Sequence, residues 1–235
     1  MRAASTRLMI AALIATLTVT AAGCGSGPAA GENTGTITGQ LATGAPKDLN
    51  LLEADSEDVI DQVPDGNWEK VNKDLAEMTD AWTAYRLLAV DAGATQGQVD
   101  ELDAAFARLT DDIASRNGPG TEQGANDVSR IVVELFGLYE IPYPVQVGRL
   151  DVIGRQIIFD TRADDFDKAT AQVEAARQAW DAMAEDIRSK SPEVADQMDA
   201  IMAALSNAAT ESNGEILIDQ AQVLLEVVDE IESLY

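Results

Sequence analysis

The chain has 235 residues, 46% of them hydrophobic and only 5% aromatic, so it can bury a core and has the composition of helices rather than of a sandwich or barrel. Its 41 Asp and Glu against 16 Lys and Arg give a net charge of -25, which excludes nucleic-acid binding through a basic surface. It has no His and one Cys, which excludes Ser-His-Asp and Cys-His catalysis, His-containing metal sites and an intramolecular disulfide.

Residues 1–23 have the layout of an export signal. Two arginines form a basic start, an uncharged stretch covers residues 8–22, and small residues precede Cys24. The uncharged stretch is shorter than the roughly 20 residues that a permanent membrane-spanning helix needs. We therefore expect residues 1–23 to be removed as a signal peptide.

Cys24 is the candidate lipidation site. The sequence Ala-Ala-Gly-Cys at residues 21–24 resembles the bacterial lipobox, although Ala21 stands where Leu is commonest. The resemblance implies a lipoprotein whose lipidated Cys24, carrying fatty acyl chains such as palmitate, holds the mature chain on the extracytoplasmic face of the cell membrane. The alternative is an ordinary secreted protein, cut at the same small residues.

Residues 24–47 are predicted to form a lipidated flexible tether. They are rich in Gly, Thr, Ala and Ser and have no apolar periodicity. A coil of this length would hold the body roughly 25 Å from the membrane. The helical domain is then expected to cover residues 48–235.

Apolar residues in the body recur at alternating spacings of three and four, which predicts long amphipathic helices. The first such series is Trp68, Val71, Leu75, Met78, Trp82, Tyr85 and Ala89. The second follows 98 residues later as Phe166, Ala169, Val173, Ala176, Trp180, Met183 and Ile187. Further matches follow each series in the same order, so the sequence predicts an internal duplication, with repeat 1 at about 49–141 and repeat 2 at about 146–235.

The fold class predicted is all-α, an antiparallel helical bundle. Breakers and periodicity place helices near 49–62, 67–92, 97–116, 122–140, 146–163, 165–190, 192–211 and 215–234. Short connections favour antiparallel neighbours, and the result is either a single up-and-down bundle or two fused bundles. The sequence leaves these two architectures open.

The predicted helix at 146–163 is the least ordinary, because apolar residues cover most of its circumference. Arg155 should therefore be partly buried and needs an acidic partner. Asp151 lies one turn before it, and Asp160 is a second candidate. Arg155 either forms a structural ion pair or binds an anion in a cavity of the bundle, and the sequence does not decide between these roles.

Trp82 and Trp180 occupy matching positions in the two apolar series, and both should be mostly buried as core residues whose indole N–H finds a carbonyl or carboxylate partner. Alternatively, the two tryptophans form the aromatic walls of a ligand cleft.

The acidic loops do not fit the EF-hand spacing, since Val63 stands where an oxygen ligand belongs. We expect no metal and no cofactor.

The sequence indicates a non-enzymatic, lipid-anchored binding or interaction protein whose protein or small-molecule partner is open. The first alternative is a sensory or solute-capturing module that holds a small ligand near Arg155 and the two Trp residues. The second is a hydrolase that uses carboxylates alone, for which the sequence offers no motif. A polar cavity would favour the solute-capturing module, and an exposed apolar patch would favour the interaction protein.

Overall fold

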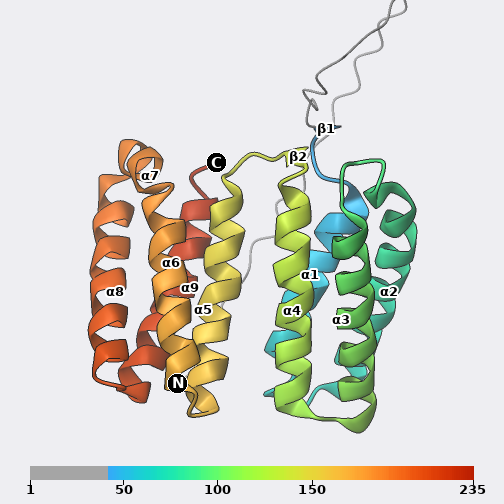
Figure 1. Cartoon of the computed structure of the whole chain (residues 1–235), viewed down its shortest axis with the longest axis horizontal. Coiled ribbons are helices and arrows are strands. Elements are labelled where there is room, and N and C mark those ends of the chain that lie inside the picture. The colour runs from blue at the N-terminus through green and yellow to red at the C-terminus, as the bar shows by residue number, and fades with distance from the viewer. Residues whose placement is uncertain (1–41) are drawn as a thin grey trace, which may run out of the picture. The chain divides into compact units, whose positions relative to one another are not determined.

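Nine helices and two short strands make up residues 42–235, the part of the chain that this computed structural model describes (Figure 1). The predicted signal peptide, Cys24 and most of the predicted tether lie outside these residues. The helices are α1 (Lys47–Gln62), α2 (Trp68–Ala89), α3 (Gln96–Ser115), α4 (Gly118–Phe136), α5 (Val145–Arg162), α6 (Phe166–Asp181), α7 (Ala184–Lys190), α8 (Pro192–Thr210) and α9 (Gly214–Glu232). The strands are β1 (Ala42–Thr43) and β2 (Tyr139–Glu140).

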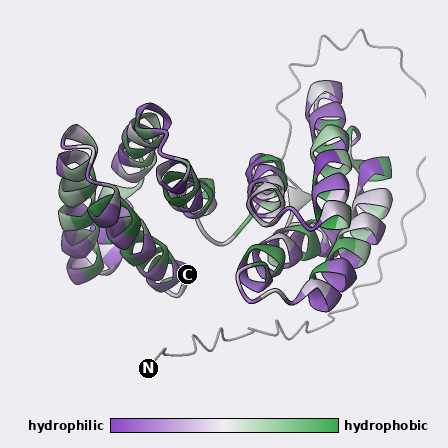
Figure 2. Cartoon of the chain, turned by 90° about the horizontal axis from the view of Figure 1, so that it is seen from below, coloured by the Kyte–Doolittle hydropathy of each residue, from purple (hydrophilic) through white to green (hydrophobic). Residues whose placement is uncertain are grey.

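The helices form an all-α fold of two fused bundles, which confirms the predicted fold class and resolves its open alternative. Helices α1 to α4 enclose one hydrophobic core, and α5 to α9 enclose another. Figure 2 shows the apolar faces of the helices turned towards the inside of each group. Phe159 on α5 packs against both cores. None of the described helices is long and apolar enough to cross a membrane.

Side-chain caps begin most of the helices. Asn67, Asn117 and Asn213 each accept a hydrogen bond from a backbone N–H in the first turn of the helix that follows. Thr95 and Gln98 form a reciprocal capping box at the start of α3. These caps fix where the chain reverses direction, and the short connections make successive helices antiparallel.

The start of α4 corrects one predicted boundary. The helix predicted at 122–140 starts after Gly118-Pro119-Gly120, but α4 already begins at Gly118. Proline is compatible with the first turn of a helix, because its missing N–H would have no intrahelical partner there. The helix ends at Phe136, which leaves residues 139–140 free to form β2.

The predicted helix at 165–190 is divided into α6 and α7. The chain turns at Ala182 and Met183, where the backbone N–H of Met183 donates to the carbonyl of Trp180. No Gly or Pro marks this position, so the sequence gives no breaker signal for it. Helix α7 connects α6 to α8 at one end of the second group, whose long helices α5, α6, α8 and α9 run antiparallel in succession (Figure 1).

A parallel strand pair, which the sequence did not predict, joins β1 to β2. Ala42 pairs with Tyr139 and Thr43 with Glu140, and the N–H of Gly44 donates to the carbonyl of Glu140. The pair holds the first described residues against the connection between α4 and α5. It lies at the end of the first bundle where α2 and α4 also finish (Figure 1).

Candidate functional site: the polar interface between the bundles

Trp82 and Trp180 are core residues, as the sequence predicted, with 6% and 1% of their surfaces exposed. The indole N–H of Trp82 donates to Asp103 at 2.8 Å, and that of Trp180 donates to Asp199 at 2.7 Å. Each belongs to the core of its own bundle. They do not line the pocket described below, so the two tryptophans do not form one ligand cleft.

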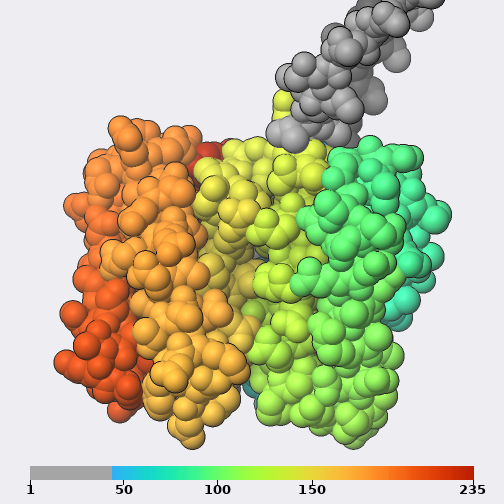
Figure 3. Space-filling view, viewed as in Figure 1, coloured from blue at the N-terminus to red at the C-terminus, as the bar shows by residue number. Residues whose placement is uncertain are grey.

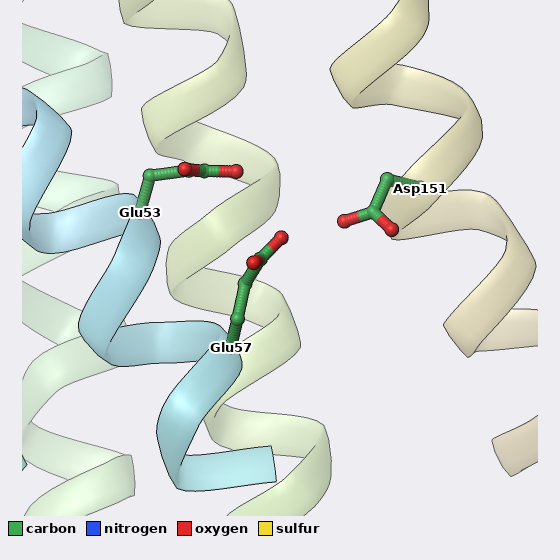
Figure 4. A group of neighbouring side chains, drawn as sticks. All are labelled: Glu53, Glu57 and Asp151. Carbon is green, nitrogen blue, oxygen red and sulfur yellow. The ribbon is translucent and has the colours of Figure 1, made fainter. Parts of the chain in front are cut away.

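Arg155 is buried on α5, also as predicted, and forms ion pairs with two carboxylates. Its guanidinium Nη2 lies 2.5 Å from Asp151 Oδ2, one turn away, and 2.7 Å from Glu57 Oε1 on α1. Figure 4 shows Glu53 and Glu57 of α1 turned towards Asp151 of α5. Glu57 is the partner that the sequence analysis missed, because it belongs to the other bundle.

Carboxylates outnumber the guanidinium in this cluster of Glu53, Glu57, Asp151 and Arg155. One oxygen from each of the three carboxylates lies within 4.8 Å of the others. Burial raises the pKa of Glu53, and the charges of Glu57 and Asp151 raise it further. Burial raises the pKa of Asp151 even though Arg155 opposes the shift. The cluster is therefore an ion-pair contact between bundles that takes up protons readily.

Asp160, the other predicted partner of Arg155, lies elsewhere on the interface. It accepts a hydrogen bond from the side-chain amide of Gln156 at 2.9 Å. Burial raises the pKa of Asp160, while the hydrogen bond from Gln156 lowers it. Asp160 thus belongs to the amide network between α4 and α5.

This amide network consists of Gln123 and Asn126 of α4 together with Gln156 of α5. Gln123 and Gln156 exchange two hydrogen bonds of 2.8 and 2.9 Å between their side-chain amides. Asn126 Nδ2 donates to the carbonyl of Val152 at 3.1 Å and to Gln156 Oε1 at 3.2 Å. Hydrogen bonds and ion pairs therefore join the bundles, in addition to the packing of Phe159 against both cores.

The same helices enclose a pocket of about 490 Å³, within the size range of small-molecule sites. Its walls come from α4, α5 and α6. The lining residues are Gln123, Asn126, Asp127, Arg130, Val133, Glu134, Arg149, Val152, Ile153, Gln156, Gln172 and Ala175. Figure 3 shows the surface hollowed between α4 and α5.

Charged pairs lie at the edge of this pocket. Arg149 forms a bidentate ion pair with Glu134, in which Nε and Nη2 each lie 2.7 Å from a carboxylate oxygen. Arg130 lies 2.5 Å from Glu101 of α3. Because each guanidinium already has a carboxylate partner, the pocket carries both charges in balanced pairs rather than a single strong charge.

One polar atom in the pocket wall has no partner among the described residues. Asn126 is 1% exposed, and no donor of residues 42–235 reaches its side-chain oxygen Oδ1. The amide orientation follows from Nδ2, which donates to two oxygens. A buried carbonyl oxygen left without a donor costs about 1 to 3 kcal/mol. Among the described pocket-lining residues, Asn126 is the one that carries such an atom.

Sequence reasoning missed the amide network, although a signal existed. Asn126 lies on α4 between the buried Ala125 and Val128, and a polar amide within an apolar stripe requires a partner. Its side-chain partner, Gln156, lies on another helix. Only the fold brings the two together.

No protein-family model, curated protein or solved structure matches the chain.

Proposed function

We propose that this chain is a lipid-anchored, extracytoplasmic binding protein that holds a small polar solute in the pocket between its two bundles. Of the roles that the sequence left open, this corresponds to the solute-capturing module. The role proposed is binding rather than catalysis. The ligand site is the amide network of Gln123, Asn126 and Gln156, and the two tryptophans stabilise the bundles on either side.

The observation that carries this proposal is the unpartnered side-chain oxygen of Asn126 in the wall of the pocket. A buried amide that serves only folding would have both of its polar atoms paired, or would be replaced by an apolar residue of similar shape. Asn126 pairs its nitrogen within the protein, while its buried oxygen has no donor among the described residues.

The lining chemistry favours a neutral or zwitterionic solute rich in N–H or O–H groups. Both hydrogens of the Gln123 and Gln156 amide nitrogens are donated within the protein, so these side chains offer a solute oxygen acceptors, and Asp127 adds a carboxylate. Arg149 and Glu134 present opposite charges side by side. A net charge of -25 disfavours approach of an anion, while it does not oppose an amino or hydroxyl compound.

The proposed anchor supports the same role. Lipidation of Cys24 would keep the binding pocket at the outer face of the membrane, where it can bind a solute that arrives from outside the cell. The lipobox-like residues 21–24 and the signal-peptide layout before them support this location.

A thermal-shift experiment tests the pocket. Mature protein, unfolded and refolded to remove any bound molecule, is screened against amino acids, sugars and nucleosides, and saturation should raise its Tm by about 5 to 10 °C for a fitting solute. Asn126→Leu should abolish that rise. Ser129→Ala is the matched control, because Ser129 is equally buried on α4 but does not line the pocket. Equal rises in both variants would refute the site.

A further inference from the structure

The last turn of α2 exposes an unusual group of apolar side chains, the α2 apolar tip, formed by Leu87, Leu88 and Val90. Their exposed fractions are 80%, 54% and 54%, the largest among the exposed hydrophobic residues of the described chain. Single exposed leucines are ordinary, but here three large aliphatic side chains are exposed within four residues. Neither the proposed pocket nor the hydrophobic cores use it.

The order of the helices places this tip at the end of the first bundle where the chain enters the fold. Helix α1 leaves β1 and α2 returns antiparallel to it, so the last turn of α2 lies at the same end as Ala42 (Figure 1). The residues that connect Cys24 to the body therefore join it at the end that carries the tip. In the second bundle, α9 also finishes at this end, next to Tyr235 (Figure 1).

Tyr235 gives the second bundle a related feature. Its ring is 38% exposed, and Lys190 Nζ lies 4.2 Å from the ring centroid. Tyrosine with an adjacent lysine is a pair of the kind enriched at the level of lipid headgroups. Both bundles thus present at one end side chains that suit a membrane–water interface.

From this placement we infer that the α2 apolar tip docks on the outer surface of the bilayer that holds the chain, with Tyr235 at headgroup depth. The inference rests on the lipid anchor of the proposed function. The segment from Cys24 to Ala42 reaches at most about 65 Å when fully extended and averages roughly 25 Å as a coil. An anchor at Cys24 thus keeps this end of the body close to the membrane.

A bilayer fits the tip better than a soluble protein partner does. Three aliphatic side chains form a small patch, well below the area of a stable protein interface. A tether, however, makes the membrane contact intramolecular and raises the effective concentration of the surface, so a small contact suffices. Because the chain is strongly acidic, the expected surface is a zwitterionic bilayer rather than an anionic one.

The test uses mature protein, residues 24–235, whose only cysteine allows coupling of Cys24 to a maleimide lipid in phosphatidylcholine vesicles. The chemical anchor replaces the biological one. Leu88→Trp reports on the tip, and Ile216→Trp is the matched control, since Ile216 is an exposed apolar residue at the start of α9, at the opposite end. The added tryptophan fluorescence is compared in vesicles with and without bromine on the acyl chains.

Docking predicts that bromine quenches the fluorescence added by Leu88→Trp at least about two-fold more than that added by Ile216→Trp. Replacing Leu87 and Val90 with Ser in the Leu88→Trp protein should remove the difference. Equal quenching at both positions would overturn the inference, as would an untethered dimer that Leu87→Ser dissolves, because the tip would then bind a second copy. Because a chemical anchor replaces the natural lipid, the outcome of this experiment is independent of whether Cys24 is lipidated in the cell.

Discussion

Arg155 of α5 donates to Glu57 of α1 at 2.7 Å, and the two residues stand 98 positions apart. This is the offset that relates the two apolar series of the sequence and that separates Trp82 from Trp180. Asp151 follows Glu53 at the same offset. Matching positions of two copies meet in this way when the copies face each other across a two-fold axis, so the contact is one that the predicted duplication would produce.

The tryptophan contacts are repeated as well. Asp103 accepts from Trp82 and pairs with Arg86, while Asp199 accepts from Trp180 and pairs with Arg188. A buried indole, a carboxylate and an arginine therefore recur in each bundle. The arginines, however, differ in position, because the chain between Trp180 and Arg188 is broken between α6 and α7.

Replacing Arg155 with Met should destabilise the protein by about 3 to 5 kcal/mol at neutral pH, since it leaves buried Asp151 and half-buried Glu57 without their cation. The loss should be smaller at acidic pH than at neutral pH, because burial raises the pKa of Asp151 and a protonated carboxyl no longer needs the cation. Urea unfolding at the two pH values measures both effects. As a control, Arg116→Met removes an exposed guanidinium and should leave stability nearly unchanged. A loss below about 1 kcal/mol in Arg155→Met would contradict the ion-pair role.

Truncating Trp82 or Trp180 to Ala should each cost about 3 to 5 kcal/mol, because both fill bundle cores. In variants that keep only one of the two, with Trp68 also replaced, acrylamide should quench both indoles weakly and to the same degree. Strong quenching of either one would show that the side chain is reached from solvent, against its core position.

The sequence predicted the helices well where periodicity and caps coincide, as at Trp68 to Ala89. The sequence did not predict the break at Ala182 and Met183, because neither residue is a helix breaker. It placed the start of α4 too late, because a Gly-Pro-Gly pattern that can end one helix can also begin the next. The strand pair of two residues each was too short to give an alternating pattern.

For the candidate site, burial of Arg155 and its pairing with Asp151 followed from the sequence, since both lie on one helix a turn apart. Its partner Glu57 did not, because pairing between helices depends on how the bundles meet. The pocket was missed for the same reason. Gln123 and Gln156 read separately as ordinary polar positions and form a network only when α4 and α5 adjoin.

Asp55 should make stability depend on acidity. Burial, followed by the charges of Asp74 and Glu77, raises its pKa to about 6. A carboxyl whose pKa is higher in the folded state binds protons more tightly there, so its penalty is full above about pH 6 and disappears as the pH falls towards about 4. Asp55→Asn should therefore stabilise the protein by about 1 to 2 kcal/mol at pH 7 and flatten the profile between these values. Exposed Asp80→Asn is the control, and an unchanged profile in Asp55→Asn would contradict this assignment.

Replacing Cys24 with Ser should abolish lipid attachment, because the thioether to diacylglycerol requires the thiol. We expect the Cys24→Ser chain to remain uncleaved or to be released into the medium, and metabolic labelling with a radioactive fatty acid should mark only the parent. A Cys24→Ser protein that is still processed, labelled and membrane-bound would show that the anchor lies elsewhere.

Native mass spectrometry of protein extracted from its own membrane shows whether the pocket beside Asn126 holds a solute. The extracted parent should carry a discrete mass excess that denaturation removes. The excess should persist in Ser129→Ala and disappear in Asn126→Leu, which replaces the unpartnered oxygen with an apolar group of similar size. A parent without bound mass, or an Asn126→Leu protein that keeps the same adduct, would show that Asn126 does not hold a solute in this pocket.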